Sequence, residues 1–166
     1  ANMADVTFSI FSGVGYGVQP LISENYGKNK FREMVYVLKM AIIVSVIMAT
    51  AIYILLYFNA VSLTGVFNSS GEDKLLFYGV QGIRVYFLAI PFIAINIVMA
   101  LSMQAMEKPR LSFIISILRG IVVLIPSAII FSNAFKIFGL WTSYVFTEFA
   151  VSVISVIFML KYVKLK

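Results

Sequence analysis

Residues 40–59 read MAIIVSVIMATAIYILLYFN, twenty positions without a charged side chain. A helix that crosses the hydrocarbon core of a bilayer needs about 20 mainly apolar residues. This stretch is therefore predicted to be a transmembrane helix.

Four further stretches resemble this one in length and composition. The first is rich in glycine and small residues, and the last two are interrupted only by Arg119 and by Glu148. A helix of small residues suits close packing against other helices. We predict an all-α integral membrane chain with five transmembrane helices, at residues 4–23, 37–60, 83–106, 111–135 and 137–160.

The composition excludes several classes of protein. Of the 166 residues, 61% are hydrophobic and 12% are charged, whereas about a quarter of the residues of a soluble domain are charged. Cysteine and histidine are absent, which excludes disulfides, thiolate or imidazole metal sites and Ser–His or Cys–His catalytic pairs. We therefore expect no enzymatic activity. The net charge is +6. In a membrane protein we expect such an excess of basic residues to lie in cytoplasmic loops, and not to form a surface that contacts nucleic acid.

The connections between the predicted helices alternate in charge. Basic residues follow the first, third and fifth helices, at Lys28, Lys30, Arg32, Lys108, Arg110, Lys161, Lys164 and Lys166. Glu72, Asp73 and Lys74 follow the second helix, and Lys136, after the fourth, is the one exception to the alternation. Because basic loops favour the cytoplasmic side, the C-terminus is predicted to be cytoplasmic. The chain begins with Ala1 and shows no signal peptide, so we expect a fragment of a longer protein.

Glycines alternate in SGVGYGVQPLISENYGKNK, residues 12–30. A phosphate-binding loop would need a preceding strand and a lysine at Walker spacing, and neither is present. A helix bent by Pro20 explains the stretch better. It is either a moving part of a transporter or a site of close helix packing.

The same region resembles the signature of the multidrug and toxic compound extrusion (MATE) family. In GVQPLISENYGKNKFREM (residues 17–34), the matching positions include Gly17, Gln19, Pro20, Ser23, Asn25 and Gly27. Lys28 and Glu24 depart from the usual pattern. Two more stretches, QAMEKPRLSFIISILRGIVVLIPSAII (104–130) and FGLWTSYVFTEFAV (138–151), resemble later helices of these transporters.

The resemblance implies helices eight to twelve of a twelve-helix transporter in the cell membrane, with an N-lobe that this chain lacks. It implies a secondary active multidrug antiporter that exports small organic, often cationic, compounds in exchange for protons or sodium ions, with no cofactor. One branch of the family carries an aspartate at a position that matches Ile93. Because no acidic residue lies between Arg84 and Met106, we do not assign the sodium site of that branch to this chain.

Several polar residues within the predicted spans are candidates for a substrate or cation pathway. Arg119 and Glu148 both fall near the midplane of consecutive antiparallel helices, so they are able to form a structural ion pair or to take part in transport. Tyr144 and Ser152 share a helix face with Glu148, and Asn96 and Gln104 share one on the third span. Pro91 and Pro126 are candidate hinges or static kinks.

Two other functions stay open. A lipid-linked oligosaccharide flippase or polysaccharide exporter of the same superfamily would need a more cationic cavity, for which Arg84 and Arg119 are available. A membrane scaffold subunit without transport activity is the alternative from another class.

Overall fold

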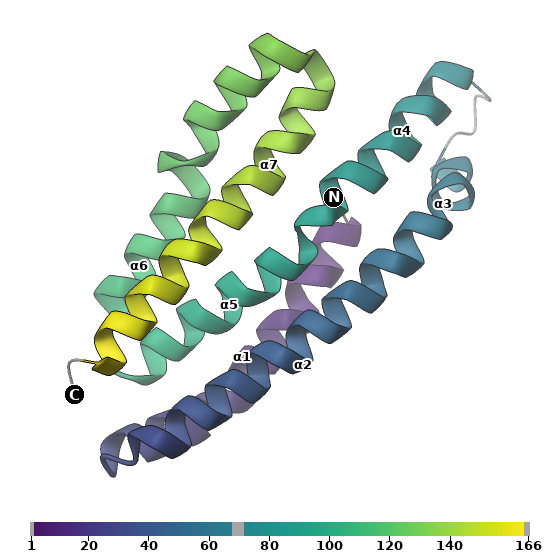
Figure 1. Cartoon of the computed structure of the whole chain (residues 1–166). Helices are drawn as coiled ribbons and strands as arrows, with labels where there is room; N and C mark the ends of the chain where they lie inside the picture. The colour runs from purple at the N-terminus through teal and green to yellow at the C-terminus, as the bar shows by residue number, and fades with distance from the viewer. Residues whose placement is uncertain (1, 68–71, 165–166) are drawn as a thin grey trace.

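The computed structural model describes residues 2–67 and 72–164, and within these ranges the chain is helical, with no strand (Figure 1). This confirms the all-α prediction. Lys166 lies outside the described residues. The elements are α1 (Asn2–Gly27), α2 (Phe31–Phe58), α3 (Ala60–Phe67), α4 (Asp73–Tyr86), the 3-10 turn η1 (Phe87–Ala89), α5 (Ile90–Ala105), α6 (Pro109–Ile117), the π-helical turn η2 (Leu118–Val122) and α7 (Leu124–Lys164).

The elements form long rods that run side by side (Figure 1). α4, η1 and α5 together make one rod, and α6 and η2 continue into the first arm of α7, residues 124–135. The chain then reverses at Lys136, which has φ 55° and ψ −129°, into the second arm of α7, residues 137–164. The predicted range 4–23 lies in α1, and the range 83–106 lies in the rod that contains α5.

The basic connections gather at one end of these rods. Figure 1 shows the α1–α2 connection, the α5–α6 connection and the C-terminal end of α7 at the lower left, and the reversal of α7 at the opposite end. At the basic end, the Lys28 ammonium donates a hydrogen bond to the Glu24 carboxylate at 2.5 Å, and this bond lowers the pKa of that carboxyl below its ordinary value. The assignment of this end to the cytoplasm stays a prediction.

α5 lies at the centre of the molecule, in contact with α1, α2, α6 and α7. One buried cluster, around Met34, Met99 and Met103, lies toward the basic end, and a second, around Phe11 and Ile90, lies further along the rods. Among the described residues, three stretches are long and apolar enough to cross a membrane: Phe31–Phe58, Asp73–Ala105 and Pro109–Lys161. In the most apolar part of the middle stretch 61% of the residues are buried, whereas the corresponding shares in the first and last stretches are 17% and 11%. The outer helices therefore present apolar faces that a bilayer would cover.

Two of these rods are interrupted next to a proline. Pro91 lies in the first turn of α5, directly after η1, where the N–H of Ile90 donates to the carbonyl of Phe87. Pro126 lies in the first turn of α7, directly after η2, where the N–H of Val123 donates to the carbonyl of Leu118 at 2.9 Å. A proline has no N–H for the carbonyl four residues earlier, so the regular ladder breaks at both places.

Candidate functional site

Glu148, on the second arm of α7, has no solvent exposure, and both of its carboxylate oxygens are occupied. The Nε of Arg119 donates to Oε1 at 2.5 Å, and the Nδ2 of Asn96 donates to Oε2 at 2.8 Å. The same Asn96 amide also lies 3.0 Å from the main-chain carbonyl oxygen of Glu148. A charged group in a bilayer is tolerated when it is paired and hydrogen-bonded, and Glu148 meets both conditions.

Three separate elements supply this network. Asn96 comes from the central helix α5, Glu148 from the second arm of α7, and Arg119 from η2. π-Helical turns are rare and occur frequently at functional sites. Here the π turn, Leu118–Val122, adds one residue to the helix and so changes the register at which Arg119 meets Glu148.

Further hydrogen bonds extend the network. The hydroxyl of Ser155 donates to Oδ1 of Asn96 at 3.3 Å, so the side-chain amide is engaged at both ends. The hydroxyls of Ser127 and Thr147 lie 3.0 Å apart and join the two arms of α7. The rods that carry Glu148 and Arg119 are therefore tied to each other and to α5.

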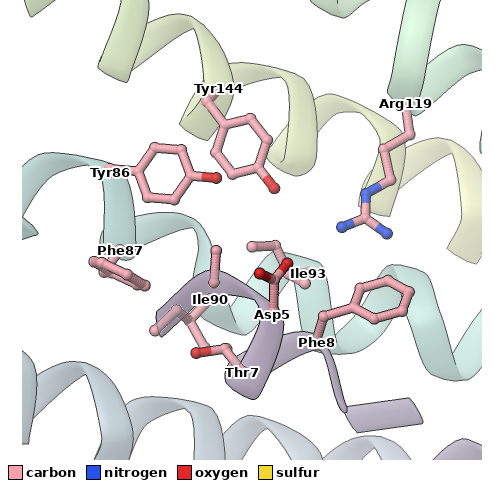
Figure 2. Close-up of a pocket in the computed structure, with 10 residues that line it drawn as sticks. Asp5, Thr7, Phe8, Tyr86, Phe87, Ile90, Ile93, Arg119 and Tyr144 are labelled. Atoms are coloured by element: carbon pink, nitrogen blue, oxygen red, sulfur yellow. The ribbon is translucent and has the colours of Figure 1, made fainter. Parts of the chain in front are cut away.

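A cavity of about 240 Å³ borders this network (Figure 2). Its wall comes from the N-terminal part of α1, from the junction of α4 and α5, and from η2 and α7. The lining residues are Ala4, Asp5, Thr7, Phe8, Tyr86, Phe87, Ile90, Ile93, Arg119 and Tyr144. Glu148 is fully buried and does not line the cavity, but its partner Arg119 does.

The cavity combines aromatic walls with two opposite charges. The rings of Tyr86 and Tyr144 stack with centroids 4.5 Å apart and planes 6° from parallel. The guanidinium carbon of Arg119 lies 6.0 Å from the ring centroid of Phe8. Figure 2 shows the carboxylate of Asp5 among these side chains, pointing into the cavity. A space of this kind suits a ligand with an aromatic or apolar body and a charged group.

The structure brings together some of the residues predicted from sequence and separates others. Glu148, Arg119 and Asn96 form the buried network, and Tyr144 borders the cavity. Gln104 lies near the α5–α6 connection, where its Nε2 donates to the Ser112 hydroxyl at 3.0 Å. The hydroxyl of Ser152 donates to the carbonyl of Phe149 in its own helix at 2.7 Å.

Asp5 is the residue that the sequence analysis did not single out. The signal was present, because an ionisable residue inside a predicted span is by itself a functional candidate, and Asp5 falls within 4–23. Among the described residues, no group of three or more acidic side chains is placed to hold a metal ion.

The residues of the sequence signature lie along the second half of α1. The Nε2 of Gln19 donates to the carbonyl of Leu101 on α5 at 3.3 Å, and the Nδ2 of Asn25 donates to the carbonyl of Leu21 at 2.9 Å. Gln19, Pro20 and Ser23 also line a shallow hollow of about 430 Å³ with residues of α5. Gly17 has no heavy atom within 4 Å of the position a Cβ would take, and Gly27 is the last residue of α1.

The chain matches the model of one protein family, MatE, over residues 1–130. No curated protein matches it. Three solved structures illustrate the likeness in fold. An inward-facing multidrug resistance MATE family transporter of the MOP superfamily has a TM-score of 0.93 at 13% sequence identity, over 98% of this chain and 38% of its own. A MOP superfamily transporter from Pyrococcus furiosus has a TM-score of 0.91 at 13% identity, over 98% and 37%. The Vibrio cholerae MATE transporter VcmN in the bent form has a TM-score of 0.82 at 14% identity, over 96% and 38%. The chain thus spans well under half the length of each.

Proposed function

The chain belongs to the MatE family, and from that premise we propose that it forms most of the second half of a secondary active transporter in the cell membrane. The complete protein would have a further lobe, and the C-terminus of this chain would be cytoplasmic. It would export organic, often cationic, compounds in exchange for protons or sodium ions by alternating access.

One observation carries this proposal: a fully buried carboxylate, paired with a guanidinium that itself lines a cavity. Glu148 and Arg119 neutralise each other, and Asp5 adds a second carboxylate on the cavity side. The three groups together carry one net negative charge when all are ionised. A cavity with a net negative charge and stacked tyrosines attracts a compound with one positive charge.

The pairing also supports coupling to a cation. Protonation of Glu148, or the approach of another cation, would weaken its hold on Arg119 and release the guanidinium toward Asp5. Because Arg119, Asn96 and Glu148 belong to three rods, a change at this pair alters how the rods are held together. A transporter that alternates between two arrangements needs such a link between charge and packing.

The experiment is flux measured in vesicles that contain the full-length transporter. A fluorescent lipophilic cation is loaded, and its movement is followed under a proton or a sodium gradient. We expect Asp5→Asn and Glu148→Gln to lower gradient-driven flux about tenfold or more, because each removes a charge from the cavity or from its paired neighbour.

Asp73→Asn is the matched control. It makes the same chemical change at the start of α4, away from the cavity, so flux is expected to stay near the wild-type value. Full flux in both Asp5→Asn and Glu148→Gln would remove these carboxylates from the mechanism. Gradient-independent movement of a lipid-linked oligosaccharide in the same vesicles would favour the flippase function instead.

A further inference from the structure

A second hollow lies on the surface of α2, away from the Glu148 network. It measures about 430 Å³ and is lined by Phe31, Arg32, Val35, Tyr36 and Lys39. Arg32 and Lys39 are both exposed, and neither forms an ion pair with another residue in the described part of the chain. Two cations thus flank an open hollow with no acidic partner among those residues.

The depth of this hollow relative to a bilayer follows from the sequence of α2. The charge-free run 40–59 begins at the residue after Lys39, so Lys39 lies at the edge of the hydrocarbon core. Arg32 lies seven residues earlier, or about 10 Å further out along the helix axis at ~1.5 Å per residue. Tyr36, which is 65% exposed, lies between them, as is typical of aromatic residues at a membrane interface. The hollow therefore lies in the layer of lipid headgroups.

An apolar strip leads from the hollow toward the membrane interior. Met40, Ile43 and Ile47 are 44%, 51% and 64% exposed, and with Tyr36 their spacing of four, three and four residues places them on one face of α2. The strip has the position and the chemistry to lie against acyl chains. The hollow and the strip together match a molecule with an anionic head and long apolar chains.

We propose that α2 binds one anionic phospholipid at this place. Arg32 and Lys39 contact its phosphate, Tyr36 covers the glycerol region, and the acyl chains lie along the strip. A phospholipid with a choline headgroup carries a compensating positive charge, so it gains less from the two cations. The inference goes beyond the proposed transport activity and does not depend on it, because it concerns a different face of the molecule.

The test is lipid binding to the purified full-length protein in mild detergent, followed by native mass spectrometry. The probes are palmitoyl-oleoyl phosphatidylglycerol, the phosphatidylcholine with the same chains, and glycerol 3-phosphate, which has the anionic group without the chains. We expect preferential retention of phosphatidylglycerol by the wild type. Arg32→Gln with Lys39→Gln is expected to weaken that retention about tenfold or more, since each cation near anionic lipid contributes a severalfold effect.

Arg110→Gln with Lys161→Gln is the matched control, because it removes two exposed cations from the same end of the molecule. Its retention of phosphatidylglycerol is expected to stay within twofold of the wild type. Ile43→Asn with Ile47→Asn tests the strip and is expected to weaken retention while both cations remain. Equal loss in the control, no preference over phosphatidylcholine, or equally tight binding of glycerol 3-phosphate would each overturn the proposal. Transport is measured separately, so these outcomes are distinguishable from failure of the proposed function.

Discussion

Arg119 and Glu148 show why a buried pair is costly to break from one side. In general, a carboxyl group in an apolar site can be neutral, whereas a guanidinium stays charged. The side chain of Arg119 keeps 22% of its exposure through the cavity, while that of Glu148 has none. Removal of either partner therefore leaves a group that is poorly solvated, but the two cases are not equivalent.

We expect Glu148→Gln to lower the stability of the full-length protein by about 3 kcal/mol, because it leaves Arg119 charged and without its partner. Arg119→Gln is expected to cost less, since a carboxyl group, unlike a guanidinium, has a neutral form available in an apolar site. The double substitution is expected to cost at least 1 kcal/mol less than the sum of the single ones. Thermal unfolding in detergent measures all three. Strict additivity would mean that the two side chains do not stabilise each other.

Asn96 is expected to matter more than its uncharged side chain suggests. Asn96→Ala removes the hydrogen bond to Oε2 of Glu148 and leaves that oxygen buried without a donor, which costs about 1–3 kcal/mol. Ser152→Ala is the control, because the Ser152 hydroxyl donates to the carbonyl of Phe149 in its own helix, and a change below about 0.5 kcal/mol is expected. Equal melting temperatures for the two variants would contradict this role of Asn96.

At the scale of single residues, sequence reasoning reached part of the site. The sequence predicts that Arg119 and Glu148 can pair, because they lie at similar depths in two consecutive antiparallel helices. Asn96 is a candidate because it shares a helix face with Gln104. Helical spacing alone does not indicate that its amide contacts Glu148. Asp5 was missed because it lies near the start of a weakly apolar segment, where its contribution depends on five other elements that form the cavity.

At the scale of the elements, close approach of the two arms of α7 depends on Gly139. A Cβ at this position would lie 1.9 Å from the carbonyl oxygen of Phe131 and 2.3 Å from its carbonyl carbon. The obstructing atoms belong to the backbone, so they cannot turn aside as the end of a side chain can. The reversal at Lys136 thus requires glycine three residues later.

Gly139→Ala is expected to lower the stability of the protein by about 1–3 kcal/mol, because the two arms must separate to admit the methyl group. Gly17→Ala provides the comparison, since no heavy atom lies within 4 Å of the added Cβ. Alanine in an open helical position is neutral or stabilises by up to about 1 kcal/mol. The measurement is the melting temperature of both variants. An equal fall in melting temperature for Gly17→Ala and Gly139→Ala would show that the contact with the Phe131 backbone is not the cause.

The sequence predicts helices from apolar length, and length alone cannot locate their interruptions. The π turn that carries Arg119 leaves no mark in the hydrophobic pattern, because it changes the register by one residue and keeps the same composition. Pro126 indicates that the helix is interrupted in this region, but it does not indicate that the interruption is a π turn. Likewise, α4 begins at Asp73, ten residues before the predicted range 83–106, since a helix continues beyond the membrane wherever packing supports it.

At the scale of the whole molecule, α1 has a surface that the described residues leave open. Phe8 and Tyr16 are 49% and 60% exposed, and helical spacing places them on the same side of α1 as Asp5. Apolar side chains on a rod can face lipid at no cost, but an ionised carboxylate cannot. The proposed additional lobe would cover this side of α1, and the share of the related structures that the chain spans, 38% or less, leaves room for one.

We therefore expect the chain to insert in membranes by itself but to be less stable there than in the complete transporter. After expression, residues 1–166 alone and the full-length protein are both expected to stay in the membrane pellet at alkaline pH, because the outer faces of the helices are apolar. In detergent, the melting temperature of the chain alone is expected to be about 10 °C lower, which corresponds to loss of an interface contributing roughly 3 kcal/mol. Asp5→Leu is expected to raise the melting temperature of the isolated chain, since it removes the uncovered charge, and to leave that of the full-length protein unchanged or lower. Equal melting temperatures for the two proteins, with no gain from Asp5→Leu, would show that α1 needs no further lobe.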